Sequence, residues 1–176
     1  MRLLEHEGKA LFAECGIVPS GRLAATPAEA VSAARDLGYP AMLKAQVVDG
    51  GRRKAGAVVQ VGDDAAARTE AAPLFAASVR GRRGEALLVE RRVSAQHEFC
   101  ISYLLDYASE RLWFLFSVLG KADADAPPAG EVLRVPAAVR RGPDLGPLAE
   151  FCARTCGGTI CSLPRSVRTW SWATTA

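Results

Sequence analysis

The stretch AMLKAQVVDGGRRKAG, residues 41–56, decides how the chain folds. Strict alternation in a strand places Met42, Lys44 and Gln46 on one face and the apolar residues between them on the other. The strand leads into a loop that contains two glycines, two arginines and a second lysine. Glycines let backbone amides approach anionic oxygens closely, and the basic side chains supply positive charge. The stretch therefore predicts a polyphosphate-binding loop, with a solvated basic hairpin as the alternative.

Lys44 is a charged residue within this otherwise largely apolar strand. A buried ammonium group loses its hydration, which is unfavourable unless an anion or a carboxylate replaces the water. The strand pattern is equally compatible with a lysine on the wet face of a half-covered sheet. Both interpretations remain open from the sequence.

Helix signals occur before and after this strand. Apolar residues at spacings of seven and eight predict a helix over about residues 3–15. Thr26, Pro27 and Glu29 predict the start of a second helix with a capping box, and Gly38 ends it. Asp63 or Asp64 is expected to cap a third helix that runs to Val79, although Pro73 should kink or divide it. The sequence thus predicts two helices before the strand at 41–47 and a third helix after residue 63.

Short apolar segments predict the strands, and they are 41–47, 57–61, 86–93, 98–105 and 112–119. The last two are joined by the polar residues 106–111, a connection of hairpin length with aspartate and serine to make the turn. The order is helix, helix, strand, strand, helix and then three strands. This order predicts an α+β fold with antiparallel sheets.

The composition limits the class of protein. The chain has 176 residues, of which 49% are hydrophobic and 23% charged, so it can bury a core as one domain or as two small lobes. A net charge of +3 is too small by itself to indicate nucleic acid as a partner, and the arginine clusters at 80–83 and 91–92 lack interleaved aromatics. No apolar run is long enough to cross a bilayer. We therefore expect a cytoplasmic protein with no membrane partner and with its five cysteines reduced.

The composition changes toward the end of the chain. Residues 121–147 are rich in Ala, Pro, Asp and Gly and are expected to form a loop or linker. No acidic residue follows Glu150, and residues 148–176 are expected to be a degenerate or disordered tail. One hypothesis is that a change of reading frame produced this tail, which translation of the gene in its other frames would test.

Several segments together resemble the opening of the β subunit of succinyl-CoA synthetase, an ATP-grasp acyl-CoA ligase. The lysine strand and the loop Gly50-Gly51-Arg52-x-Lys54-Ala55-Gly56 match that family in order and spacing. Residues 88–90 are similar to the family's hinge strand, and residues 98–102 are similar to its Glu-Leu-Tyr segment. The N-terminal motif adds Leu4, Glu7, Lys9, Leu11, Phe12, Gly16, Ile17 and Pro19. The resemblance extends over residues 1 to about 120.

The resemblance implies the N-terminal part of an ATP-grasp fold, two small lobes with antiparallel sheets, without the flavodoxin-like CoA-ligase domain. Residues 1–120 would form the nucleotide-binding region. Lys44 would contact the phosphates of ATP, or of GTP. The loop formed by Gly50, Gly51, Arg52 and Lys54 would close over them, and Glu90 and Glu98 would lie near the adenine and ribose. No catalytic residue is expected on this part of the chain.

The resemblance also implies an acid–thiol ligase reaction. In the family, ATP, succinate and CoA give succinyl-CoA through a phosphohistidine on an α subunit, which is the expected partner. We expect this chain to be inactive alone. The alternative is a non-catalytic nucleotide-binding or interaction module derived from the family.

Departures from the family pattern support that alternative. Arg53 replaces a glycine of the loop, and Asp49 places a carboxylate next to the expected phosphates. The family's Mg²⁺ ligands are an asparagine and a later aspartate, whereas this chain contains no asparagine. Mg²⁺ is thus expected for the family, but its protein ligands are not found in this sequence.

Overall fold

The computed structural model describes residues 2–17, 20–94, 99–117, 132–138, 142–143 and 146–155. The chain divides into two compact units, Met1–Ser94 and Ala95–Ala176. The boundary that we predicted after residue 120 therefore lies inside the second unit. Within the described residues, no helix is both long enough and apolar enough to span a membrane.

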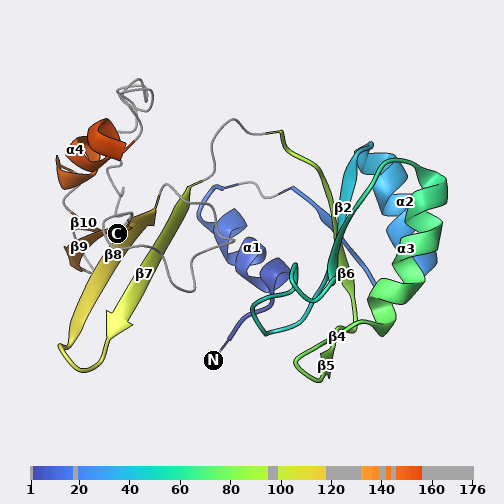
Figure 1. Cartoon of the computed structure of the whole chain (residues 1–176), viewed down its shortest axis with the longest axis horizontal. Coiled ribbons are helices and arrows are strands. Elements are labelled where there is room, and N and C mark those ends of the chain that lie inside the picture. Colours follow the sequence, from blue (N-terminus) through green and yellow to red (C-terminus); the bar gives the residue numbers. More distant parts are fainter. Residues whose placement is uncertain are drawn as a thin grey trace. The chain divides into compact units, whose positions relative to one another are not determined.

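The first unit contains a four-stranded antiparallel sheet with the order β1-β6-β2-β3. Its strands are β1 (Arg22–Ala24), β2 (Ala41–Ala45), β3 (Val58–Val61) and β6 (Leu87–Arg91), and its helices are α1 (Glu5–Glu14), α2 (Pro27–Leu37) and α3 (Asp64–Ala76). A small hairpin of β4 (Ser78–Val79) and β5 (Arg82–Arg83) precedes β6. Helices α2 and α3 cover one side of the sheet and α1 lies on the other (Figure 1).

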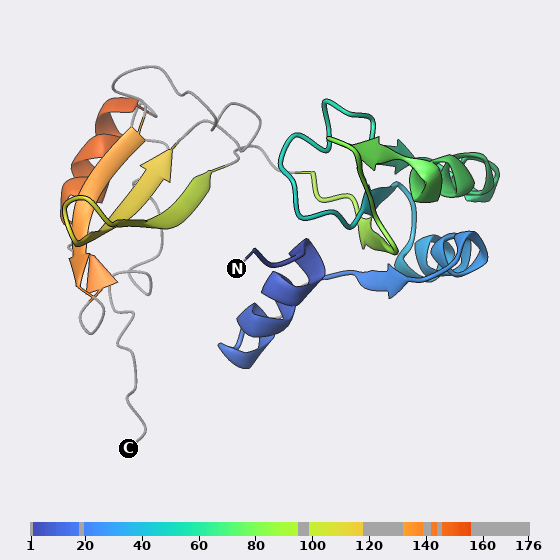
Figure 2. The same ribbon diagram turned by 90° about the horizontal axis from the view of Figure 1, so that it is seen from below.

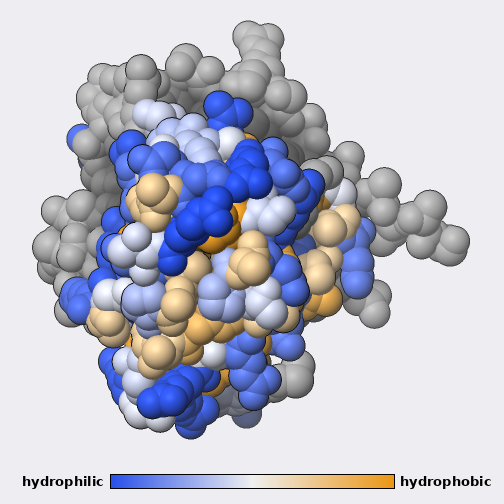
Figure 3. Space-filling view, turned by 90° about the vertical axis from the view of Figure 1, so that its right-hand side faces the viewer, coloured by the Kyte–Doolittle hydropathy of each residue, from blue (hydrophilic) through white to orange (hydrophobic). Residues whose placement is uncertain are grey.

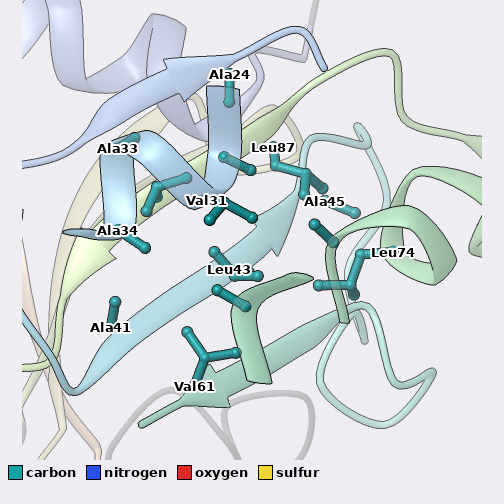
Figure 4. Close-up of a cluster of buried hydrophobic side chains, with 14 of the residues drawn as sticks. Ala24, Val31, Ala33, Ala34, Ala41, Leu43, Ala45, Val61, Leu74 and Leu87 are labelled. Atoms are coloured by element: carbon teal, nitrogen blue, oxygen red, sulfur yellow. The ribbon is translucent and has the colours of Figure 1, made fainter. Parts of the chain in front are cut away.

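The core of the first unit lies between the sheet and the helices α2 and α3. The alternate residues of β2, which include Leu43, are buried on this face, as the strand pattern predicted. Figure 4 shows their side chains together with those of Val31, Val61 and Leu74. The outer surface of α2 and α3 mixes hydrophilic and apolar residues, as expected for helices that bury one side (Figure 3). The other face of β2 is therefore free for polar side chains.

The helix starts follow the predicted capping residues. The Thr26 hydroxyl accepts a hydrogen bond from the Glu29 amide at 3.2 Å, and the Asp63 carboxylate accepts one from the Ala66 amide at 2.8 Å. The Glu29 carboxylate accepts from the amide of Ala25, one residue before the expected one. Helix α3 ends at Ala76 and continues through Pro73, so the predicted extension to Val79 was wrong. Val79 belongs instead to β4, because the chain turns there into the arginine hairpin.

The second unit contains another antiparallel sheet with the order β10-β9-β8-β7. Its strands are β7 (Cys100–Asp106), β8 (Arg111–Ser117), β9 (Val132–Ala138) and β10 (Gly142–Pro143), and its helix is α4 (Gly146–Thr155). The predicted hairpin joins β7 to β8, and Asp106 accepts a hydrogen bond from the Ala108 amide at 3.1 Å. Helix α4 packs against this sheet (Figure 2), where Phe151 meets Phe116 edge-on.

Two predictions about the C-terminal part need correction. Residues 121–147 are not only a loop, because they contain β9 and β10. Residues 148–155 belong to α4 and are held by the aromatic core of the second unit, so this part of the predicted tail is ordered. The remaining part, 156–176, lies outside the described residues.

Candidate functional site

Five charged side chains gather on the face of the first unit's sheet that α1 covers. They come from α1, β2, β6 and the loop after β2, and we call them the ionic cluster: Glu5, Lys9, Lys44, Arg52 and Glu90. Antiparallel pairing places Glu90 opposite Met42, so Glu90 and Lys44 are diagonal neighbours on the same face. The register of β2 with β6 therefore builds the centre of the cluster.

Lys44 lies at that centre. Its ammonium group is 3.0 Å from a Glu5 carboxylate oxygen and also pairs with Glu90, and 22% of its side chain is exposed. Two carboxylates thus replace much of the water that the ammonium loses. Of the two interpretations of this strand lysine, the one that requires a charged partner applies.

Arg52 brings the loop to the cluster. One of its guanidinium nitrogens lies 2.5 Å from Glu5, and another donates to the carbonyl of Ala45 at 3.0 Å. The Arg52 carbonyl accepts from the Ala57 amide at 2.8 Å. The Arg52 side chain is therefore folded back against β2. Hydrogen bonds link Arg52 to residues at both ends of the loop, Ala45 and Ala57.

Glu90 is buried, with 7% of the residue exposed. It pairs with Lys9 and Lys44, and the Lys9 ammonium also donates to the carbonyl of Ser20 at 2.9 Å. The bland alternative for Glu90, a surface carboxylate paired with Arg91 or Arg92, does not apply, because both arginines are exposed and Glu90 turns to the lysines.

Gly21 is required for this arrangement because β1 passes close to Glu90. A Cβ at residue 21 would lie 2.9 Å from Cγ of Glu90 and 3.1 Å from the Val89 carbonyl. The φ angle of Gly21 is +122°, a value that residues with side chains rarely adopt. Only glycine allows β1 and Glu90 to approach so closely.

The other predicted loop residues lie outside the ionic cluster. Gly50, Gly51 and Lys54 are exposed, and Gly51 has a φ angle of +81°. Arg53 is exposed as well, so its side chain does not fill the loop. The structure therefore brings Lys44, Arg52 and Glu90 together and leaves the glycines and Lys54 on the loop surface. Glu98 lies outside the described residues.

Asp49 does not act on the cluster as a free negative charge. Its two carboxylate oxygens lie 3.6 Å from Arg2 and 3.3 Å from Arg82. These contacts link the start of the loop to the N-terminus and to the β4–β5 hairpin. Two arginines thus offset the charge that we expected to disfavour phosphate.

Helix α1 supplies site residues that the sequence reasoning did not select. Glu5 and Lys9 are one helical turn apart and reach Lys44 and Glu90. The His6 amide donates to the Gln46 side-chain oxygen at 3.1 Å, and the Gln46 amide group donates to the Lys44 carbonyl at 3.1 Å. The spacing of Glu5 and Lys9 was a usable signal, because residues four apart share one helix face.

The apolar spacing that predicted α1 does not mark a buried side. Leu11 and Phe12 are 49% and 56% exposed, and α1 buries none of its residues. The helix meets the sheet through its polar face, because that face of β2 carries Lys44 and Gln46.

Burial and neighbouring charges shift the pKa values of Glu5 and Lys9. Burial opposes ionisation of Glu5, but hydrogen bonds and charges from Lys44 and then Arg52 outweigh it and lower its pKa. Burial, together with the charge of Lys44, lowers the pKa of Lys9. The cluster contains three basic side chains and two carboxylates. Lys44 and Arg52 both pair with the Glu5 carboxylate. Among the described residues, no group of three or more His, Cys, Asp or Glu side chains is placed to hold a metal ion.

Comparison with protein families gives a match over most of the chain. A model described as "ATP-grasp domain" matches residues 2–127. The succinate–CoA ligase [ADP-forming] β subunits of Pyrobaculum aerophilum and Natronomonas pharaonis are 36% and 38% identical over 126 and 121 residues. These alignments cover 71% and 68% of this chain but only 33% and 32% of the relatives. The chain thus spans about a third of the length of the curated relatives that it matches.

Solved structures show the same fold. A dinucleotide-forming acetyl-coenzyme A synthetase 1 from Candidatus Korarchaeum cryptofilum, in complex with coenzyme A, Ca-AMPCP and HgCl⁺, has a TM-score of 0.56 at 26% identity. The match covers 67% of this chain and 54% of that one. PH1788 from Pyrococcus horikoshii has a TM-score of 0.64 at 18% identity, covering 86% of this chain and 63% of that one, which is a likeness of fold alone.

Proposed function

Because the chain belongs to the ATP-grasp domain family, we propose that its first unit binds ATP as part of a succinate–CoA ligase-type acyl-CoA ligase. The observation that carries this proposal is the pairing of Lys44 and Arg52 around one carboxylate. Two cations held by a strand and by the adjacent glycine-containing loop can bind phosphate oxygens in the same way. The Korarchaeum synthetase was solved in complex with AMPCP, an adenine nucleotide analogue, which supports a nucleotide as the ligand.

Each site residue has a role in this proposal. Lys44 and Arg52 bind the phosphates, and Gly50, Gly51 and Lys54 form the loop that closes over them. Glu90 and Glu98 face the ribose and adenine. Glu90 also positions the Lys44 ammonium, with which it pairs. These contacts orient the nucleotide and neutralise part of its charge. Phosphoryl transfer depends mainly on these two effects.

The reaction requires parts beyond this nucleotide site. In the proposed ligase, ATP, a carboxylate and CoA give acyl-CoA, ADP and phosphate, with an α subunit as partner. Mg²⁺, when bound with ATP, would neutralise part of the triphosphate charge. We propose that turnover needs this α subunit, so that the chain alone does not form acyl-CoA.

A non-catalytic nucleotide-binding module derived from the family is the second candidate. The exposed Arg53 in the loop favours it, because glycine stands at this position in the family that the sequence resembles. The two candidates share the nucleotide site and differ in the reaction. Formation of acyl-CoA after addition of an α subunit would distinguish them.

Equilibrium titration of the full chain with ATP, with and without Mg²⁺, tests the shared site. We expect saturable binding that Lys44→Ala reduces at least tenfold, because the variant leaves the phosphates without their central cation. Arg91→Ala is the matched control, since it removes an exposed positive charge from β6, the strand of Glu90. Absence of binding by the folded wild-type chain would contradict the proposal, as would equal loss in both variants.

A further inference from the structure

Helix α1 places a carboxylate between the two cations that we assign to phosphate. One Glu5 oxygen lies 3.0 Å from the Lys44 ammonium, and the other lies 2.5 Å from the Arg52 guanidinium. A phosphate group would use two of its oxygens in the same bridging arrangement. We propose that Glu5 occupies a phosphate position, so that polyphosphate must displace Glu5 and loosen α1 before binding Lys44 and Arg52. This inference rests on the proposed nucleotide site.

The neighbours of Lys44 and Arg52 leave little room for a further ligand to reach these two cations. Lys44 pairs with Glu90 as well as with Glu5, and Arg52 donates to the Ala45 carbonyl as well as to Glu5. The side chains of Lys44, Arg52 and Glu5 are only 17–22% exposed. A polyphosphate that approached while Glu5 stayed in place would meet a negative charge at both cations. Like charges in a partly buried site repel strongly, so the ligand and Glu5 exclude each other.

The contacts of α1 with the sheet are such that the helix can leave the sheet at a low cost in free energy. None of its residues is buried, and the contacts to the sheet face are polar ones made by Glu5, His6 and Lys9. Displacement of Glu5 removes two of the ion pairs and exposes little apolar surface. Segments held by few buried apolar contacts open at low free energy. The phosphate contacts with Lys44 and Arg52 replace those that Glu5 loses.

Titration with inorganic triphosphate tests the competition without the adenine and ribose contacts. We expect Glu5→Gln to bind triphosphate about tenfold more tightly than the wild type, because the neutral amide no longer competes for the two cations. Glu14→Gln is the matched control, since it removes an exposed charge from the other end of α1 and should leave the affinity unchanged. Circular dichroism checks that both variants are folded. Equal or weaker binding by Glu5→Gln would overturn the inference and make Glu5 a residue that positions Lys44 and Arg52.

A second measurement uses the wild-type chain and so does not depend on the folding of a variant. Saturating triphosphate should accelerate tryptic cleavage after Lys9, followed by mass spectrometry, because α1 loosens when Glu5 is displaced. Unchanged or slower cleavage at this site would overturn the inference.

The triphosphate titrations also distinguish failure of the proposed nucleotide site from failure of the inference about Glu5. If triphosphate binds neither the wild type nor Glu5→Gln, the proposed function fails. If it binds the wild type through Lys44, as shown by loss in Lys44→Ala, but Glu5→Gln is not tighter, only the inference about Glu5 fails.

Discussion

Gly21 and Glu90 illustrate how single residues determine the ionic cluster. Glu90 is buried against β1 and holds Lys9 and Lys44, and β1 can pass it only because residue 21 has no side chain. A backbone constraint far from the loop in sequence thus supports the charge arrangement at Lys44.

Gly21→Ala should lower both stability and nucleotide affinity. The added Cβ would lie 2.9 Å from Glu90 at a φ angle of +122°, so we expect a loss of about 1–3 kcal/mol in the free energy of unfolding. Displacement of Glu90 should also weaken ATP binding. Urea unfolding and ATP titration measure the two effects, with Gly62→Ala as the control, because a Cβ there meets nothing within 4 Å. Equal stability of the two variants would contradict this account.

For single residues, the sequence predicted where the Lys44 side chain lies better than it predicted the residues that pair with it. Alternation in residues 41–47 placed its side chain on one face with Met42 and Gln46, and it left open whether the ammonium meets a charged partner or lies on a wet face. It could not identify Glu5 and Glu90, which lie 39 residues before and 46 residues after Lys44 in the numbering. Such pairings depend on strand register and helix docking, which local patterns do not encode.

The elements α2 and α3 are joined by a polar contact at their ends. Arg35 of α2 donates to Asp64 of α3 at 3.0 Å, and the Tyr39 hydroxyl donates to the same carboxylate at 2.8 Å. The hydrogen bonds from Arg35 and then Tyr39 lower the Asp64 pKa from 3.8 to about 2. Burial, and then the hydrogen bond to Asp64, raise the Tyr39 pKa from 10.0 to about 12.

These pKa shifts predict how the stability of this helix pair depends on pH. Because the folded-state pKa of Asp64 is lowered, its contribution is complete above about pH 4 and disappears as the pH falls toward 2. The Tyr39 contribution is complete below its ordinary pKa of 10.0 and disappears as the pH rises toward 12. Thermal unfolding of wild type and Asp64→Asn should differ at pH 6 and converge near pH 2. A difference that stays constant down to pH 2 would show that Asp64 acts otherwise.

Capped helices were the elements that the sequence predicted best. Thr26 and Asp63 predict the starts of α2 and α3, because their side chains accept hydrogen bonds from backbone amides in the first turn. This interaction is local, so the sequence shows it. Strand β9 was missed because it follows a Pro- and Ala-rich segment and contains Pro136. Pro136 pairs with Trp113 of β8, and β10 pairs only with Ala137 and Ala138. A proline inside a segment argues against a central strand, which is why the sequence did not predict β9.

The whole chain has two compact units, each with its own buried cluster. Length and composition allowed either one domain or two small lobes, and the family resemblance implied two lobes. Neither predicted a boundary at Ser94, because the residues around it carry no Pro or Gly signal. The cores differ in kind, since the first consists mainly of Ala, Val and Leu and the second is centred on three phenylalanines.

Separate cores predict that damage to one unit is confined to it. Leu43 is fully buried in the first core, and Leu43→Ala should cost about 2–5 kcal/mol in the unfolding of that unit. Scanning calorimetry should resolve one transition that moves to lower temperature in the variant and one that does not. A single transition that shifts as a whole would show that the two units unfold together.

The central claim is that the loop after β2 binds the phosphates of a nucleotide. Hydrogen–deuterium exchange of the full chain, with and without saturating ATP, tests this location most directly. We predict slower exchange in peptides that cover residues 48–56 and no change over the arginine hairpin at 80–83. Saturable ATP binding that protects the hairpin and leaves residues 48–56 unchanged would contradict the account.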